Sequence, residues 1–350
     1  MHGGLEERIV KQLLSDAIDS YADFRRSQGL AKNTLRHDRT VLKHFLANVG
    51  NVWCHSLTER HVTIHFSERS KTCASASLRV DHATLSTFFA WCRHTRRMAA
   101  DSNPLYGRRM GGQVERERHR IHVSKFPLLL DLAEQSHPRN RALVAVLLYT
   151  LLRGSDASSL RVGDVELDAG YIRASIRKTH REDRIPVSAE LDTEVRAWLR
   201  FYTEECGKLD PRWYLLPARQ VAPIREGPSY KIIGHVSRLQ PTKRLHQVSE
   251  IVNPILERLG VPLVDEDGNR TREGGHTLRR SGARALFDAW RDAGYDGAMR
   301  TVQAMLHHKS ITQTERYLGL TADRLTRDEL VRGKTLFPAA EQAARLERIG

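Results

Sequence analysis

The sequence predicts a mostly α-helical protein of two domains, with a small antiparallel β-sheet in the second domain. Three observations support this fold class. Apolar residues recur at helical spacing through the first hundred residues, a length of 350 residues favours two domains, and one central segment alternates apolar and polar side chains. Apolar residues form 40% of the chain and charged residues 28%, as in ordinary globular proteins.

The first domain, to which we assign residues 1–104, is predicted to consist of helices. The first helix has apolar side chains at helical spacing, at Ile9, Leu13, Ala17, Tyr21 and Phe24. The second helix follows a cap at Asn33 and Thr34, and the third begins near Thr58. The fourth ends before Pro104, because a residue that precedes proline avoids the helical conformation.

Two segments are predicted to lie outside the domains. In residues 105–120, glycines and the charged run Glu-Arg-Glu-Arg-His-Arg replace the apolar periodicity, which is typical of an interdomain linker. The tail, residues 334–350, has the pattern of a short helix with little to bury by itself. We interpret the tail as a candidate helix for docking in trans on a partner molecule.

The second domain, residues 121–333, contains the predicted sheet. Residues 171–177 alternate apolar and polar side chains, and residues 184–187 follow a polar turn, so the two segments form an antiparallel hairpin. The segment 207–275 shows no clear pattern. Helices are expected on both sides of the hairpin and to dominate the rest of the domain, with the clearest at about residues 123–135, 139–152 and 189–202.

The charge of the chain predicts a polyanionic partner. Lys and Arg total 56 against 42 for Asp and Glu, which gives a formal net charge of +14. Nucleic acid is the commonest polyanion that such a surface meets. An anionic membrane is the alternative partner, but the sequence shows neither a basic amphipathic helix nor a lipid anchor. The longest apolar run, Ala142–Leu152, is shorter than the roughly 20 residues that span a bilayer.

The sequence also favours a cytoplasmic protein without a metal or other cofactor. Its first residues, MHGGLEERIV, lack the basic start and apolar stretch of a secretion signal. The four cysteines form no C-x-x-C pair, which fits free thiols in a reducing compartment. Cys54, His61 and His65 are disfavoured as zinc ligands, because no second pair of ligands follows at the spacing of a zinc site.

The second domain contains several side chains suited to phosphate chemistry. Arg153 directly follows the apolar run, where an arginine needs either an ion-pair partner such as Asp156 or an anionic ligand. Lys178 stands beside the turn of the hairpin. Each has an ordinary structural interpretation, because arginines at helix ends commonly form ion pairs and most hairpin lysines face water.

Two further places lie closer to the C-terminus. His276 and Arg279 are three residues apart and share one helix face. His308 precedes Tyr317 by nine residues, with Ser and Thr capping residues between them. Taken singly, the first pair has the pattern of a surface ion-pair set, and the tyrosine that of a half-buried packing residue.

Taken together and in order, six residues resemble the catalytic signature of the tyrosine recombinases, the phage integrase family: Arg153, Lys178, His276, Arg279, His308 and Tyr317. The segments K-T-H-R-E-D-R-I-P, H-T-L-R and L-H-H, the last followed by the tyrosine, are similar to the boxes of that family. The Phe-Phe-Ala-Trp core and final Asn-Pro of the fourth helix resemble the end of its core-DNA-binding domain. The likeness covers roughly residues 10–330.

The chain departs from the family pattern at three positions. Leu151 and His307 stand where the first and last boxes often have glycine, and Arg280 stands where the second often has histidine. None of these changes removes a catalytic side chain, but the missing glycines raise the question of local backbone fit. Two adjacent histidines also compete for one role, and the spacing to Tyr317 selects His308.

The resemblance implies a helical, SAM-like core-DNA-binding domain and an α+β catalytic domain that clamp the DNA. It also implies cleavage without metal or ATP, through a 3′-phosphotyrosyl intermediate and a free 5′-hydroxyl. The implied roles are nucleophile for Tyr317, binding of the non-bridging oxygens for Arg153 and Arg279, a further hydrogen bond for His308, general base for His276 and general acid for Lys178.

The implied partners are double-stranded DNA core sites, a homotetramer that acts through a Holliday junction, and an accessory DNA-bending or directionality factor. The free protein is expected to be a monomer or weak oligomer. Few residues precede the first helix, so we expect a simple recombinase without an arm-binding domain, which integrates or excises a phage or mobile element. The alternatives are a Xer-like chromosome-dimer resolvase or invertase, a type IB topoisomerase, and a noncatalytic DNA-binding protein.

Overall fold

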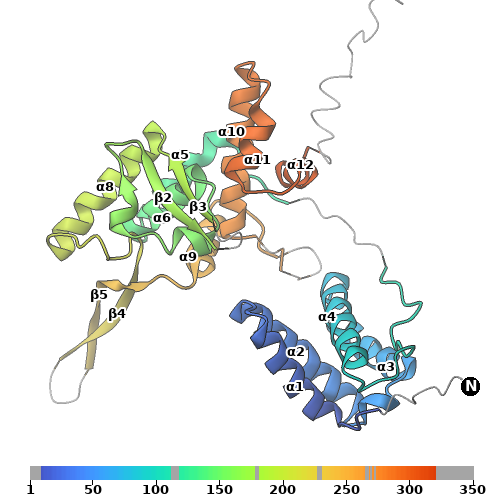
Figure 1. Cartoon of the computed structure of the whole chain (residues 1–350). Coiled ribbons are helices and arrows are strands. Elements are labelled where there is room, and N and C mark those ends of the chain that lie inside the picture. The colour runs from blue at the N-terminus through green and yellow to red at the C-terminus, as the bar shows by residue number, and fades with distance from the viewer. Residues whose placement is uncertain are drawn as a thin grey trace, which may run out of the picture. The chain divides into compact units, whose positions relative to one another are not determined.

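The computed structural model of the protein divides into two compact units, Met1–Arg116 (unit 1) and Glu117–Gly350 (unit 2) (Figure 1). The predicted bounds of the domains and linker stay a prediction, and the tail from 334 to 350 lies outside the described residues. The structure describes residues 9–111, 118–177, 181–226, 231–264, 268, 270–271 and 273–320.

Unit 1 contains the helices that the periodicity predicts. A buried aromatic cluster, Tyr21, Phe45, Phe88 and Phe89, lies at their centre. The rings of Tyr21 and Phe88 meet edge to face with centroids 5.3 Å apart, a geometry that aromatic pairs favour. The helices are α1 (Leu14–Ser27), α2 (Lys32–Val49), α3 (Glu59–Ser70) and α4 (Ser75–His94), with a 3-10 turn at Cys54–Ser56.

The starts of these helices differ in part from the prediction. α1 begins at Leu14, not at Ile9, and Ile9 is exposed. α2 begins at Lys32 after Ala31, without a side-chain cap, so the predicted cap at the following two residues is wrong. α3 does begin after Thr58, which forms a capping box with His61.

Unit 2 combines helices with two separate antiparallel sheets (Figure 1). Its helices are α5 (Phe126–Glu134), α6 (Pro138–Tyr149), α7 (Gly154–Ala157), α8 (Ala189–Cys206), α9 (Val248–Arg258), α10 (Gly275–Asp292), α11 (Ala298–Met305) and α12 (Ile311–Leu318). Its strands are β1 (Val165–Glu166), β2 (Tyr171–Ile176), β3 (Arg181–Pro186), β4 (Pro217–Glu226) and β5 (Lys231–Arg244). Short 3-10 turns lie at Val123–Lys125 and Val162–Asp164.

The predicted hairpin is the centre of the first sheet. Strands β2 and β3 pair from Tyr171 opposite Pro186 to Ile176 opposite Arg181, and β1 adds a short third strand beside β2. Ile172, Ala174 and Ile176 are buried while the residues between them are more exposed, because successive side chains of a strand point to opposite faces. The alternation of apolar and polar residues in the sequence therefore arises because only one face of the hairpin is buried.

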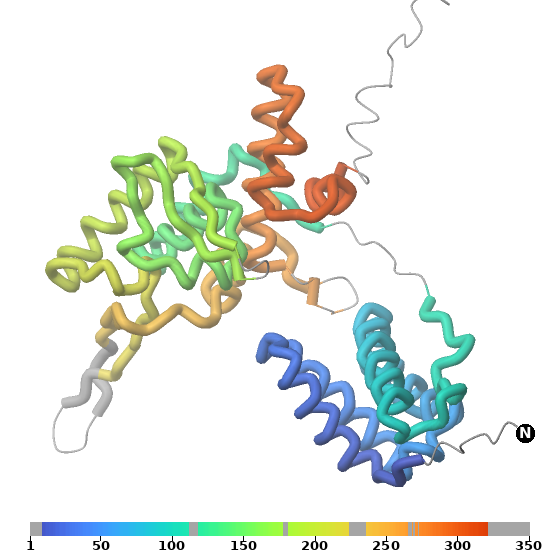
Figure 2. The backbone as a smooth tube through the Cα atoms, viewed as in Figure 1, coloured from blue at the N-terminus to red at the C-terminus, as the bar shows by residue number. Residues whose placement is uncertain are grey.

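The second sheet lies within the segment 207–275, for which the sequence shows no clear pattern. β4 and β5 form a long two-stranded ribbon that projects from the rest of unit 2 (Figures 1 and 2). Val221 is 54% exposed, so this part of the ribbon lacks the burial that would impose an alternating pattern. Pro223 and Pro241 also argue against strands when the sequence alone is read, because proline is rare inside sheets. Both strands of a two-stranded ribbon are edge strands, however, and an edge strand tolerates proline.

Helix α6 forms the core of unit 2 and is packed closely against α10. A Cβ atom added to Gly282 of α10 would lie 1.9 Å from the carbonyl oxygen of Leu148 in α6, so only glycine permits this approach. The contact brings the first turns of α10 beside the C-terminal end of α6. No helix among the described residues, α6 included, is both long and apolar enough to cross a membrane.

Candidate active site

Arg153 lies where the chain turns out of the core after α6. It is the N-cap residue of α7, and its Nη1 atom is 3.9 Å from Oδ2 of the buried Asp156. Within the described residues, neither of these two atoms has a hydrogen-bond partner. The two predicted partners are thus neighbours, but their hydrogen-bonding capacity is not used up.

Arg279 lies one turn into α10 and is 1% exposed. Its Nη2 atom donates to the carbonyl oxygen of Leu306 at 2.7 Å, whereas Nη1 has no hydrogen-bond partner in the described part of the chain. Burial lowers the pKa of Arg279 to about 10, so the guanidinium still carries its charge at neutral pH. A buried cation with a spare donor is suited to an anionic ligand.

Tyr317 lies near the end of α12 and is half-buried. Its hydroxyl donates at 3.4 Å to the backbone carbonyl oxygen of His276, an exposed residue in the first turn of α10. Burial raises the pKa of the Tyr317 hydroxyl, and the positive charges of Arg279, Arg280 and Arg153 oppose that rise. Three guanidinium groups from two separate parts of the chain therefore act on one phenol.

The adjacent histidines 307 and 308 have different surroundings. The ring of His308 meets that of Tyr317 edge to face, with centroids 5.2 Å apart, and its Nδ1 atom is 3.1 Å from Oγ1 of Thr314. The Nε2 atom of His307 is instead 3.5 Å from Oδ2 of Asp183 in β3. The structure thus places His308, the histidine chosen by spacing, beside the tyrosine.

The two missing glycines of the family pattern occur at left-handed backbone positions. Leu151 follows α6 with a φ of 55°, and His307 follows α11 with a φ of 51°. Residues in this conformation commonly end helices, and glycine adopts it without the cost of roughly 1–2 kcal/mol that other residues incur. The backbone conformation that glycine favours is therefore present at both positions, with local strain.

Arg280 is a residue whose contribution sequence reasoning missed. It is 7% exposed, forms an ion pair with Glu273, and donates to Thr277 Oγ1 at 3.3 Å and to the carbonyl oxygen of His119 at 3.4 Å. In the sequence it counted only as a departure from the family pattern. Its position next to Arg279 was the available signal that it brings a further positive charge toward Tyr317.

Lys178 lies outside the described residues, so the structure reports only on the strand before it. The backbone N–H of Arg177 donates to Oδ1 of Asp156 at 3.4 Å. The residue that directly follows β2 therefore contacts the carboxylate that also neighbours Arg153.

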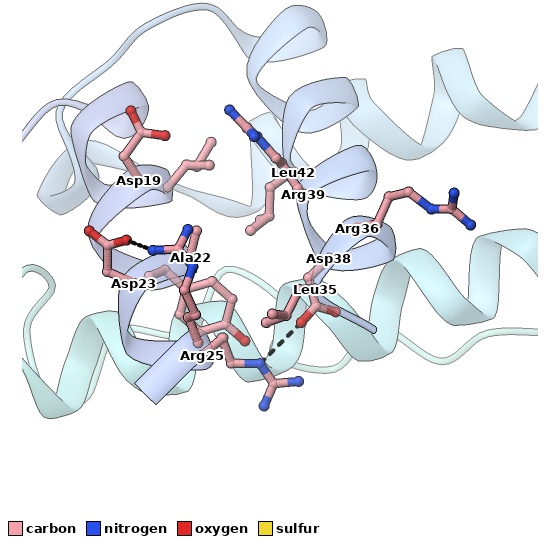
Figure 3. Close-up of a pocket in the computed structure, with 12 residues that line it drawn as sticks. Asp19, Ala22, Asp23, Arg25, Leu35, Arg36, Asp38, Arg39 and Leu42 are labelled. Carbon is pink, nitrogen blue, oxygen red and sulfur yellow. Dashed lines mark hydrogen bonds and ion pairs between the residues drawn. The ribbon is translucent and has the colours of Figure 1, made fainter. Parts of the chain in front are cut away.

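Other places in the described residues offer less chemistry. No group of three or more His, Cys, Asp or Glu side chains among them could hold a metal ion. A hollow between α1 and α2 in unit 1 is lined by charged residues, but Arg25 and Asp38 there pair with each other at 3.0 Å (Figure 3). None of the six predicted catalytic residues lines this hollow.

Comparison with known proteins settles the family. Residues 119–324 match the phage integrase family, which is more than half of the chain. The chain belongs to this family. The predicted resemblance is confirmed, and with it the predicted class of enzyme, a tyrosine recombinase that acts in site-specific recombination.

The relatives include Xer recombinases from distant organisms. The chain is 23% identical over 319 residues to tyrosine recombinase XerD of Ralstonia nicotianae, which covers 89% of this chain and 92% of the relative. It is 22% identical over 316 residues to tyrosine recombinase XerA of Pyrococcus furiosus, which covers 90% of this chain and 93% of the relative. Both relatives thus match across the two units.

Solved structures confirm the fold class. Residues 75–356 of lambda integrase, as a dimer bound to a COC′ core site, match 88% of this chain and 95% of that chain, with a TM-score of 0.64 and 16% identity. A lambda integrase tetramer bound to a Holliday junction matches 86% of this chain and 79% of that chain, with a TM-score of 0.63 and 16% identity. The mostly helical fold with small antiparallel sheets is therefore that of known integrases.

Proposed function

We propose that this recombinase cleaves DNA by attack of the Tyr317 hydroxyl on a backbone phosphorus, which forms a 3′-phosphotyrosyl bond and releases a 5′-hydroxyl. One observation carries the proposal: Arg153 and Arg279 present Nη1 atoms without hydrogen-bond partners among the described residues, and both act electrostatically on this tyrosine. Two guanidinium groups can bind the two non-bridging oxygens on which negative charge gathers during attack.

The remaining roles follow from the chemistry of attack and departure. The phenol must lose its proton, and burial raises its pKa, so a nearby acceptor is needed. We assign this role to the imidazole of His276, a residue that lies beside the phenol because its backbone carbonyl oxygen accepts from the Tyr317 hydroxyl. His308 donates a further hydrogen bond to the phosphate. Lys178 gives a proton to the leaving 5′-oxygen as general acid, and Asp156 supports Arg153.

The new ester is similar in energy to the bond that it replaces, so a 5′-hydroxyl from another strand can reverse the step without ATP. Two such exchanges within a homotetramer, through a Holliday junction, would recombine two core sites. The structural neighbours bound to a core site and to a Holliday junction support this assembly. Its place of action would be DNA in the cytoplasm, with an accessory factor that sets direction.

The DNA-binding surface has a candidate in unit 1. Lys32, Arg36, Arg39 and Lys43 recur along α2 at intervals of three and four, and all four are exposed. Within the described residues none of them forms an ion pair, so we call these four residues the α2 basic stripe. Such a stripe binds phosphates and releases counterions regardless of base sequence.

The biological reaction is proposed to be integration or excision of a phage or mobile element. A Xer-like role in resolving chromosome dimers or inverting DNA is the second candidate, because the matching relatives are named Xer recombinases. A two-site assay separates both from a topoisomerase, since only a recombinase joins flanks that come from different DNA molecules. The repeats that flank the gene then distinguish an element boundary from a chromosomal resolution site.

The nucleophile is tested by Tyr317→Phe on a nicked DNA core site. We expect the covalent protein–DNA adduct to disappear while DNA binding stays close to that of the wild type, because the ring is kept and only the hydroxyl is lost. Tyr295→Phe is the matched control, since that tyrosine is 51% exposed in the same unit. Adducts with the Tyr317→Phe protein would show that another residue attacks the phosphate.

A further inference from the structure

His307 connects separate elements of the active site. It is the left-handed residue after α11, and its side chain is 15% exposed. Its Nε2 atom lies 3.5 Å from Oδ2 of Asp183 in β3. The imidazole also interacts electrostatically with Arg279 of α10, and with Arg153 and Asp156 at the start of α7. A glycine at this position would make none of these contacts.

The hairpin β2–β3 has a second attachment to the site. Directly after β2, the N–H of Arg177 donates to Oδ1 of Asp156 at 3.4 Å. In β3, Oδ2 of Asp183 lies 3.5 Å from Nε2 of His307. His307 directly precedes His308 and belongs to the segment that leads to Tyr317. Each strand of the hairpin is therefore tied to a different part of the active site close to its turn.

We propose that His307 is a positioning residue, which holds strand β3 through Asp183 against the segment that carries Tyr317. The inference rests on the proposed function, because its consequence is correct delivery of a proton to the leaving 5′-oxygen by the hairpin. Proton transfer requires the donor to lie within hydrogen-bond reach, so a loose hairpin lowers the rate of this step.

Bound DNA would strengthen the contact between His307 and Asp183. In the free protein, burial lowers the pKa of His307, and the charges of Arg279 and Arg153 lower it further, whereas Asp183 and Asp156 oppose the change. A phosphate held by the two arginines adds negative charge beside the imidazole and favours its protonated form. The contact would then be an ion pair, so the hairpin is fastened most firmly when substrate is present.

A change of leaving group tests the inference. A DNA strand with sulfur in place of the bridging 5′-oxygen releases a thiolate, which departs without a general acid because the corresponding thiol has a pKa near ~8.5. The variants are His307→Asn, which tolerates the left-handed backbone, and Asp183→Asn. Glu182→Gln is the control, because Glu182 is exposed on the same strand and forms no ion pair with the described residues.

We expect both variants to cleave ordinary DNA about tenfold more slowly, a part of the roughly 100-fold or greater effect of a general acid. With the sulfur substrate, their rates should lie within about twofold of the wild type, since no proton is needed. The double variant should be no slower than either single variant, because both changes remove one contact. Glu182→Gln should behave as the wild type on both substrates.

Three results would overturn the inference: equal losses on the two substrates, additive losses in the double variant, or unchanged cleavage of ordinary DNA. If the wild type forms no adduct with either substrate, the proposed function fails instead. The contact between His307 and Asp183 is then tested without DNA, by comparing the unfolding temperatures of the wild type, the single variants and the double variant at a pH below the pKa of His307. Non-additive shifts in the double variant support the contact, and additive shifts refute it.

Discussion

Asp81 in unit 1 and Arg279 in unit 2 are both almost fully buried, but their surroundings differ. The carboxylate of Asp81 accepts from Nε of Arg69 at 2.7 Å and lies 3.8 Å from Nε2 of His65. Arg279 has no acidic partner at ion-pair distance among the described residues, and one of its nitrogens makes no hydrogen bond there. A buried charge that serves the fold is paired within the fold, whereas one that serves a ligand keeps bonding capacity free.

A second arginine shows that burial alone does not make this distinction. Arg139 in α6 is 4% exposed, and burial lowers its pKa to about 10, as for Arg279. Its guanidinium donates to the carbonyl oxygen of Pro217 at 3.0 Å and to Oδ1 of Asn140 at 2.9 Å. Arg139 therefore ties α6 to β4 and to its own neighbour, and needs no ligand.

The largest expected effect is on the cleavage rate, when Arg279 is replaced. Arg279→Met should lower the rate of adduct formation by about 100-fold or more, because one donor to the developing charge is lost. Its free energy of unfolding should fall less than that of Arg139→Met, because only one acceptor, the carbonyl oxygen of Leu306, loses its donor, and the desolvation cost of the buried cation is removed at the same time. Cleavage of a nicked core site and denaturant unfolding measure the two effects.

Arg139→Met is the matched control and should show the opposite result. Its free energy of unfolding should fall by about 1–3 kcal/mol, because the loss leaves a buried carbonyl oxygen and amide oxygen without a donor. The cleavage rate of the folded protein should stay near that of the wild type. If both variants lose stability alike and neither loses cleavage, the distinction between the two arginines is wrong.

The paired charge of unit 1 gives the next largest effect. Asp81→Ala should lower the free energy of unfolding by about 3 kcal/mol, because Arg69 is left without its partner in a mostly buried setting. Asp23→Ala removes a surface partner of Arg26, whose side chain is 67% exposed, and should stay within about 0.5 kcal/mol of the wild type. Denaturant unfolding compares the two, and equal losses would contradict a special role for the buried pair.

The smallest expected effect concerns the surface charges. Arg36→Gln with Arg39→Gln in the α2 basic stripe should weaken DNA binding and lower the slope of log affinity against log salt by about 2, one for each phosphate contact. Arg196→Gln is the control, because Arg196 already pairs with Asp168 and Asp192. A slope that falls equally in both proteins would refute the stripe as a DNA-binding surface.

The sequence predicts the parts of the fold in which burial is one-sided. Helices of unit 1 and the hairpin β2–β3 bury one face each, so their apolar residues recur with the period of the element. The ribbon β4–β5 has no such period, and its prolines suggest loops. Helix starts were predicted less well, because α1 and α2 begin without a side-chain cap.

The candidate site was predictable where residue type alone carries the chemistry. Arg153, Arg279 and the pair His308 and Tyr317 come from three separate parts of the sequence, yet their order and spacing identify the family and the structure brings them together. The contribution of His307 depends on a left-handed backbone and on a contact with another strand. Such features depend on tertiary geometry, so no local pattern of residues predicts them.

The proposed phosphate ligand Arg279 and the proposed nucleophile Tyr317 lie on helices that differ greatly in how firmly they are packed against the protein. Arg279 belongs to an 18-residue helix packed against the core by way of Gly282, whereas Tyr317 belongs to the eight-residue α12, whose buried side chains are Thr314 and Leu318. Small helices with little buried surface can shift at low energetic cost. In the proposed mechanism, Tyr317 could therefore move with the DNA strand to which it is joined, while Arg279 stays in place for the return reaction.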